Sequence, residues 1–148
     1  MSPPSPTASP SAASAASRVL TGGRRDGLFY PPTVLDRIER AMPAYREEIF
    51  GPVAPVLTFR TDAEAVEIAN DTEYGLTAAV HSRSVPRATA LVGRLRTGMA
   101  HINGVTAQDA ANAPFGGMGA SGNGTRIGGT ANLDQFTQWR WSTAPDAP

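Results

Sequence analysis

Residues 76–103 read L-T-A-A-V-H-S-R-S-V-P-R-A-T-A-L-V-G-R-L-R-T-G-M-A-H-I-N. Two short apolar runs near its ends, Leu76–His81 and Met99–Asn103, are typical of strands. The residues between them suffice for one helix, and this order favours a right-handed crossover between parallel strands. The stretch therefore predicts an α/β protein built on a partial parallel sheet with crossover helices.

The helix of this unit carries its own start and stop signals. Ser84 is typical of an N-cap, and Pro86 fits the first turn, where no backbone N–H is needed. We expect the helix to continue to about Arg96 and Gly98 to act as its C-terminal stop.

The same alternation extends upstream. Val53–Phe59 predicts a strand, and Thr61 with Glu64 forms a capping box that begins a helix reaching about Asn70. Before it, Leu28–Leu35 predicts a short extended segment that its prolines confine to an edge or bend. Strand, helix, strand, helix, strand in this order predicts consecutive crossovers in one parallel sheet.

The composition excludes several classes of function. The 148 residues carry 13 acidic and 13 basic side chains, so charge gives no bias toward nucleic acid or an anionic membrane. No apolar run approaches the roughly twenty residues that cross a bilayer. All the basic residues are arginines, which removes Schiff-base lysine chemistry. Cysteine is absent, so no disulfide framework forms, and we expect a cytoplasmic protein.

The two ends differ from the rest of the chain. Residues 1–17 are almost entirely Ser, Ala, Pro and Thr, too poor in apolar surface to offset the entropy of ordering. We expect this segment to be disordered, and residues 142–148 to form a loose tail. The domain proper is expected to span residues 18–141.

Four motifs follow one another along the chain. They are R-E-E-I-F-G-P at 46–52, N-D-T-E-Y-G-L at 70–76, G-M-A-H-I-N at 98–103 and P-F-G-G-M-G-A-S-G-N-G at 114–124. In order and spacing they resemble the C-terminal part of the catalytic domain of the aldehyde dehydrogenase superfamily. T-G-G-R-R-D-G-L-F-Y at 21–30 and the ending over 131–141 look like the branch that oxidises aromatic aldehydes such as benzaldehyde and vanillin.

The resemblance assigns roles to three side chains. It implies that Glu48 accepts hydrogen bonds from the nicotinamide-ribose hydroxyls of NAD or NADP, a task suited to an ionised, acceptor-only carboxylate. It implies that Phe50 packs beside the nicotinamide ring and that Phe115 lines the pocket of a small-molecule aldehyde. The alternatives are a solvated charge cluster for the run around Glu48 and a core anchor for Phe115.

The chain also departs from the family. Aldehyde dehydrogenases attack the aldehyde with a cysteine thiolate, and this sequence has no cysteine, so no catalytic residue is assigned. The family's main cofactor-binding domain, water-activating glutamate and oxyanion-stabilising asparagine lie in segments upstream of the resemblance. We therefore expect a piece of the enzyme that is inactive alone.

Other routes to catalysis have weaker support. Ser121 does not fit a nucleophile elbow, because Asn123 stands where a glycine belongs. His81 and His101 read mainly as polar positions on strands, and their spacing does not suit a metal site. Residues 117–122 match the dinucleotide fingerprint formally, but the glycine-rich sequence after them is unsuited to the helix that this motif needs. Those glycines instead suggest close backbone packing.

The last segment, Phe136–Trp141, alternates in a way that suits a strand. In the family the equivalent strand pairs subunits, so the resemblance implies a homo-oligomer formed through it. An unpaired edge with Trp139 and Trp141 exposed would be prone to aggregation. Two alternatives remain: a non-catalytic remnant that pairs with a full-length homologue through this strand, and a split gene whose other frame supplies the cysteine.

Overall fold

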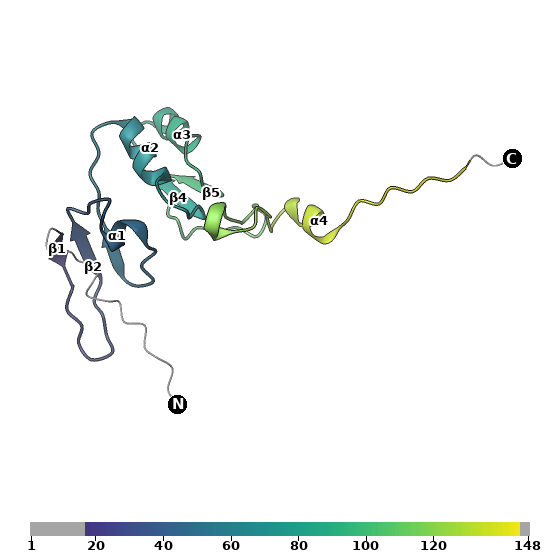
Figure 1. Cartoon of the computed structure of the whole chain (residues 1–148). Helices are drawn as coiled ribbons and strands as arrows, with labels where there is room; N and C mark the ends of the chain where they lie inside the picture. The colour runs from purple at the N-terminus through teal and green to yellow at the C-terminus, as the bar shows by residue number, and fades with distance from the viewer. Residues whose placement is uncertain (1–16, 146–148) are drawn as a thin grey trace. The chain divides into compact units, whose positions relative to one another are not determined.

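The structure is a computed structural model that describes residues 17–145, and it divides into two compact units, Met1–Arg60 and Thr61–Pro148 (Figure 1). The predicted disorder of residues 1–17 falls, apart from Ser17, outside the described residues, as do the last three residues of the predicted loose tail. Residues 142–145 belong to no helix or strand.

The first unit is a three-stranded sheet with one short helix. The strands lie in the order β1-β2-β3, with β1 antiparallel and β3 parallel to β2. The elements are β1 (Arg18–Thr21), β2 (Thr33–Asp36), α1 (Pro43–Arg46) and β3 (Val53–Pro55). The expected extended segment at 28–35 is thus a strand of four residues, since Pro31 and Pro32 lack backbone donors.

The core of the first unit lies where α1 meets β2. Its buried side chains are Leu35, Ile38, Met42 and Ala44, and the partly buried Tyr45, Ile49, Val53 and Leu57 pack against them. The strand predicted over 53–59 ends at Pro55, because prolines at both 52 and 55 leave few N–H groups for a ladder.

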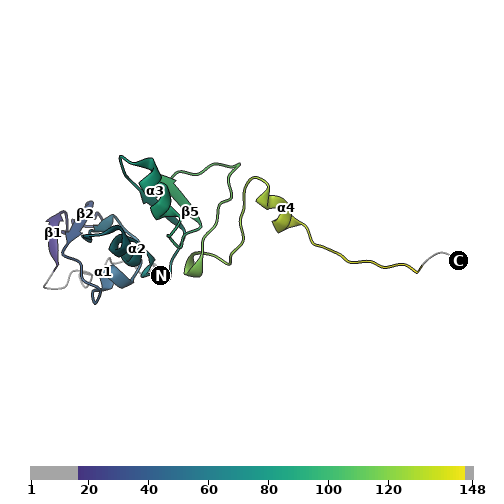
Figure 2. The same ribbon diagram turned by 90° about the horizontal axis from the view of Figure 1, so that it is seen from above.

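The second unit contains the predicted crossover. Its elements are α2 (Asp62–Asn70), β4 (Thr77–Val80), α3 (Val85–Val92), β5 (Met99–Ile102), the 3-10 turn η2 (Gly119–Ser121) and α4 (Ala131–Phe136). Strands β4 and β5 are parallel, with Thr77 opposite Met99 and Val80 opposite Ile102. Helix α3 packs on both strands and lies beside β5 in Figure 2. The α/β class with a small parallel sheet is confirmed.

The prediction of one continuous sheet is wrong. The described residues form two separate sheets, β1-β2-β3 and β4-β5. Strand β3 pairs with β2, through bonds from the Thr33 amide to the Pro52 carbonyl (2.8 Å) and from the Val56 amide to the Leu35 carbonyl (2.8 Å). A three-residue strand bounded by prolines has few donors left for a second neighbour.

The helix starts are confirmed and one helix end is wrong. The Thr61 hydroxyl accepts from the Glu64 amide at 3.1 Å, and the Ser84 hydroxyl accepts from the Arg87 amide at 3.4 Å. Helix α3 ends at Val92 with Gly93 as C-cap, one turn before the predicted end. After the helix, backbone hydrogen bonds join residues three positions apart, such as the one from the Arg94 amide to the Leu91 carbonyl (2.9 Å).

The predicted terminal strand does not form. Phe136 is the last residue of α4, and residues 137–145 belong to no ladder. In Figures 1 and 2 this segment leaves α4 without lying beside another strand. A strand needs a neighbour to satisfy its backbone groups, and the described part of the chain provides none here.

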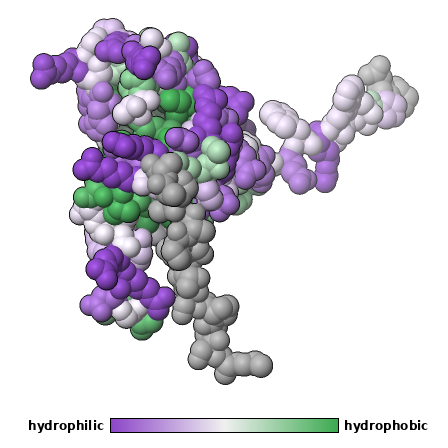
Figure 3. All heavy atoms as spheres, turned by 60° about the vertical axis from the view of Figure 1, so that its left-hand side comes forward, coloured by the Kyte–Doolittle hydropathy of each residue, from purple (hydrophilic) through white to green (hydrophobic). Residues whose placement is uncertain are grey.

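Much apolar surface is exposed in both units, as the green areas of Figure 3 illustrate. The exposed large side chains include Leu28, Phe29, Phe50, Phe59, Ile127, Leu133, Phe136, Trp139 and Trp141. Surfaces of this kind usually contact something else. Within residues 17–145 no helix has the length and apolar character to cross a bilayer.

Candidate functional site

Glu48 and Phe50 lie on the surface of the first unit, on either side of an anchored residue. Ile49 is half-buried and packs against the core. After α1 the backbone is extended at Glu47 (φ −108°, ψ 146°), and neighbouring side chains of an extended chain point in opposite directions. The inward Ile49 therefore leaves Glu48 exposed and Phe50 88% exposed. A bond from the Gly51 amide to the Ile49 carbonyl (2.9 Å) then turns the chain.

This surface can receive a polar and a flat group together. The Glu48 carboxylate accepts no hydrogen bond from any residue between 17 and 145, so its oxygens are available to two hydroxyl donors. The exposed ring of Phe50 offers an apolar face nearby. This segment thus exposes a carboxylate and an aromatic face together.

Phe115 belongs to the second unit, at the neck of a loop. Its amide donates to the Ile127 carbonyl at 2.6 Å, and the Ile127 amide donates back to the Phe115 carbonyl at 2.9 Å. This pair closes the loop of residues 116–126. The Phe115 ring is 41% exposed, so it is not a buried core anchor within this unit. Glu48 and Phe50 belong to the first unit, and Phe115 belongs to the second.

Glycines bring three motifs of the second unit into contact. We call Gly75, Gly98 and the segment 116–121 the glycine junction. A Cβ atom added to Gly98 would lie 1.7 Å from the Gly116 carbonyl oxygen, and one added to Gly75 would lie 2.7 Å from the Arg96 carbonyl oxygen. Gly119 combines a positive φ of 56° with a virtual Cβ 2.2 Å from the Glu73 carbonyl oxygen. Only glycine allows backbones to approach this closely.

Hydrogen bonds fix the glycine junction. The Gly75 carbonyl accepts from the Gly98 amide at 3.0 Å and from the Met118 amide at 2.9 Å. The Ser121 hydroxyl accepts from the Gly75 amide at 3.1 Å. Ser121 therefore holds a loop in place. The dinucleotide fingerprint over residues 117–122 is followed by no α-helix before Ala131.

Two asparagines of the motifs hold loops through both ends of their amides. Asn70 donates to the Arg94 carbonyl at 2.9 Å and accepts from the Arg96 amide at 2.8 Å, which explains why α3 stops early.

Asn103, with φ at 54°, accepts from the Ser82 amide at 2.8 Å and donates to the Ser82 carbonyl at 3.0 Å. In the sequence, both asparagines stand out only as members of the motifs that carry the resemblance. The signal for Asn103 was its place before Gly104 at a strand end, typical of a left-handed turn residue.

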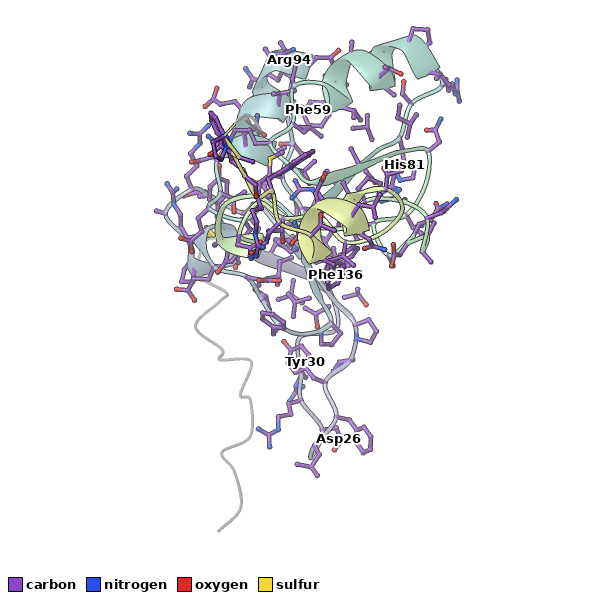
Figure 4. All side chains as sticks on the ribbon, turned by 90° about the vertical axis from the view of Figure 1, so that its right-hand side faces the viewer. Asp26, Tyr30, Phe59, His81, Arg94 and Phe136 are labelled. Carbon is purple, nitrogen blue, oxygen red and sulfur yellow. The ribbon has the colours of Figure 1, made fainter. Side chains whose placement is uncertain are left out.

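The histidines take different positions. His101 lies in β5, and its Nε2 atom is buried without a hydrogen-bond partner in the described structure, as is the Thr77 hydroxyl oxygen. Because Thr77 pairs with Met99 and residue 79 with His101, both atoms belong to one face of the sheet. His81 follows β4 and is exposed (Figure 4). Between residues 17 and 145 no cluster of three or more ligating side chains suits a metal.

One ion pair joins α2 to α3. The Arg87 guanidinium donates from Nε to Asp62 Oδ2 at 2.8 Å and from its terminal nitrogen to Asp62 Oδ1. The hydrogen bond from Arg87 lowers the pKa of Asp62 below its ordinary value of 3.8, and the same bond raises the pKa of Arg87. Both groups meet solvent, so the pair is mainly a positioning contact.

Comparisons with known proteins agree with the motifs. The model of the aldehyde dehydrogenase family matches residues 9–142. The vanillin dehydrogenase of Pseudomonas fluorescens is 46% identical over 131 residues, which cover 88% of this chain and 27% of that protein. The benzaldehyde dehydrogenase (NAD(+)) of Pseudomonas putida is 43% identical over 138 residues, covering 93% and 28%.

A solved structure shares the fold. The crystal structure of a salicylaldehyde dehydrogenase from Pseudomonas putida G7, complexed with salicylaldehyde, matches with a TM-score of 0.82 and 39% identity. The match covers 89% of this chain and 27% of that one. The chain thus spans about a quarter of the length of the relatives it matches.

Proposed function

Since the chain belongs to the aldehyde dehydrogenase family, we propose that it forms the C-terminal part of the catalytic domain of an NAD(P)+-dependent enzyme that oxidises an aromatic aldehyde to its acid. The observation that carries this proposal is the exposed pair of Glu48 and Phe50 within a family motif. The aromatic substrate is supported by the names of the relatives, which are vanillin and benzaldehyde dehydrogenases.

In this proposal NAD(P)+, when bound, supplies the acceptor for the hydride that leaves the substrate. Glu48 accepts hydrogen bonds from the ribose hydroxyls, and Phe50 packs along the nicotinamide ring and keeps water from one side of it. Phe115 forms a wall on the substrate side. Such contacts act by orientation, and ideal proximity is worth up to roughly 7–11 kcal/mol of a barrier.

We further propose that the 148-residue chain turns over no aldehyde by itself. Attack on the carbonyl requires a thiolate in this family, and these residues include no cysteine. Purified chain incubated with benzaldehyde and NAD(P)+ should form no NAD(P)H. Turnover above that of a Glu48→Ala variant would refute this part of the proposal.

A chimera tests the positive part. Residues 18–141 replace the matching region of the vanillin dehydrogenase of Pseudomonas fluorescens, and vanillin-dependent NAD(P)H formation is measured. We expect activity, and a loss of about 10- to 100-fold in Glu48→Gln, because charge-assisted hydrogen bonds contribute about 1.5–3 kcal/mol. Glu47→Gln in the same chimera is the matched control. A folded chimera without activity, or equal effects of the two substitutions, would contradict the proposal.

A second candidate function is an interaction module that pairs with a full-length homologue. It is supported by the exposure of Phe136, the last residue of α4 (Figure 4), and by the exposure of Trp139 and Trp141 after that helix. An extended segment with free backbone groups can add to the edge of another sheet. The chain should then co-purify with such a homologue, and Trp139→Ala with Trp141→Ala should abolish this. A tag-purified chain that retains no homologue counts against it.

A further inference from the structure

Two Asn-Gly pairs of the second unit, Asn103–Gly104 and Asn123–Gly124, share one chemical weakness. The backbone nitrogen of the glycine can attack the asparagine Cγ and form a five-membered succinimide, with the side-chain amide leaving as ammonia. Water then opens the ring to aspartate or isoaspartate. A following glycine favours the reaction, because it has no Cβ to block the approach and rotates freely. The structure treats the two pairs very differently.

Asn103 is held against this reaction. Its Oδ1 accepts from the Ser82 amide at 2.8 Å, and its Nδ2, the leaving nitrogen, donates to the Ser82 carbonyl at 3.0 Å. Both bonds run to another strand end, so the amide must give up both partners before it can turn toward Gly104. Gly104 also has closer neighbours than Gly124, since a Cβ added to it would lie 3.1 Å from Gln108 Oε1 and 3.5 Å from the His101 Cβ atom.

Asn123 is in the opposite situation. It is exposed, and its Oδ1 accepts from the Thr125 amide at 3.0 Å and the Thr125 hydroxyl at 2.7 Å. This turn folds the side chain over the peptide of Gly124, so Cγ and the attacking nitrogen belong to the same small hydrogen-bonded ring.

The leaving group and the glycine are also unhindered. Within residues 17–145 the Nδ2 of Asn123 has no hydrogen-bond acceptor. Gly124 has a positive φ of 89°, and a Cβ added to it would meet nothing within 4 Å. The strands and helices that restrain Asn103 have no counterpart here, because Asn123 lies in irregular backbone beyond η2.

We propose that Asn123–Gly124 is a site of spontaneous modification in the folded chain, where the Gly124 nitrogen displaces ammonia from Asn123 and hydrolysis by water leaves aspartate or isoaspartate. No oxidation or reduction occurs: one C–N bond forms as another breaks, and water supplies the new oxygen. The product adds a negative charge to the loop that the Phe115–Ile127 pair closes. Isoaspartate also adds one methylene to the backbone of that loop.

The test compares both sites in one peptide. The full 148-residue chain is incubated in neutral buffer, and samples taken over time are digested with trypsin, which releases residues 97–126 with both sites. Tandem mass spectrometry locates the conversion of amide to acid. We expect Asn123 to convert about tenfold faster than Asn103, equivalent to ~1.4 kcal/mol in the barrier.

Two controls isolate the cause. In chain denatured with urea, where the fold no longer distinguishes the sites, the two pairs should convert at similar rates. Asn123→Gln, whose longer side chain forms the ring poorly, should stop conversion at 123 and leave Asn103 unchanged. Equal rates in the native chain, faster conversion at Asn103, or an Asn123 that stays intact while the denatured chain converts would each overturn the proposal.

Discussion

Replacing Gly98 by alanine should disrupt the glycine junction. The new Cβ would lie 1.7 Å from the Gly116 carbonyl oxygen and 2.8 Å from the Gly116 carbonyl carbon. Non-bonded Cβ atoms essentially never come closer than 3.0 Å, so the two backbones must separate by roughly 1.3 Å, a typical overpacking distortion. That movement strains the bonds that the Gly75 carbonyl accepts from Gly98 and Met118.

The expected cost is about 2–4 kcal/mol in the free energy of unfolding, from about 1–3 kcal/mol of overpacking and ~1 kcal/mol of weakened hydrogen bonding. This is a large share of the stability of an ordinary domain. Urea unfolding followed by circular dichroism measures it. Gly93→Ala is the matched control, because Gly93 has helical φ and its Cβ would sit in ordinary contact at 3.6 Å.

Gly93→Ala should change stability little or raise it by about 0.4–1 kcal/mol, since it restricts the unfolded chain. The two variants carry the same chemical change and differ only in their surroundings. If Gly98→Ala proves as stable as Gly93→Ala, the close approach of the three motifs is not a feature of the folded chain.

Three further predictions concern the second unit. Ser121→Ala should lower the free energy of unfolding by ~1 kcal/mol, because the Gly75 amide loses its acceptor; an unchanged urea midpoint would contradict this. The lowered pKa of Asp62 means that its pairing stabilises the fold above the ordinary value of 3.8 and is lost as pH falls through the folded pKa. In an NMR titration of the unchanged chain, the midpoint of the Asp62 carboxyl should lie below 3.8. In Arg87→Gln the midpoint should return to that value, and equal midpoints in the two proteins would exclude the ion pair. Both tryptophans should be quenched fully by acrylamide, and a protected fraction would show that the tail is covered.

Local chemistry explains what the sequence could predict about the fold. The starts of α2 and α3 were foreseeable, because Thr61 and Ser84 cap amides only three residues away. The end of α3 was not, because it depends on Asn70, which captures groups at Arg94 and Arg96 from more than twenty positions away. Pairing of Phe136–Trp141 likewise depends on a neighbour that the described chain does not contain.

The candidate site shows the same division. The outward positions of Glu48 and Phe50 follow from one apolar anchor, Ile49, in an extended segment. For the glycines, the sequence predicts close backbone packing but does not indicate which segments they contact. Which carbonyls approach Gly75 and Gly98 depends on contacts between distant segments, and spacing alone does not reveal them.

Two residues opposite each other on parallel strands never exchange two backbone N–H···O hydrogen bonds, because their donors and acceptors are staggered. Where β4 and β5 end, the carboxamide of Asn103 forms such a reciprocal pair of hydrogen bonds with the backbone of Ser82. The loop toward α3 and the loop toward Phe115 therefore both start from this hydrogen-bonded pair of residues. Aspartate could not replace Asn103 here, since an ionised carboxylate has no donor for the Ser82 carbonyl. A single side chain thus fixes the positions of the two segments that leave the ends of β4 and β5.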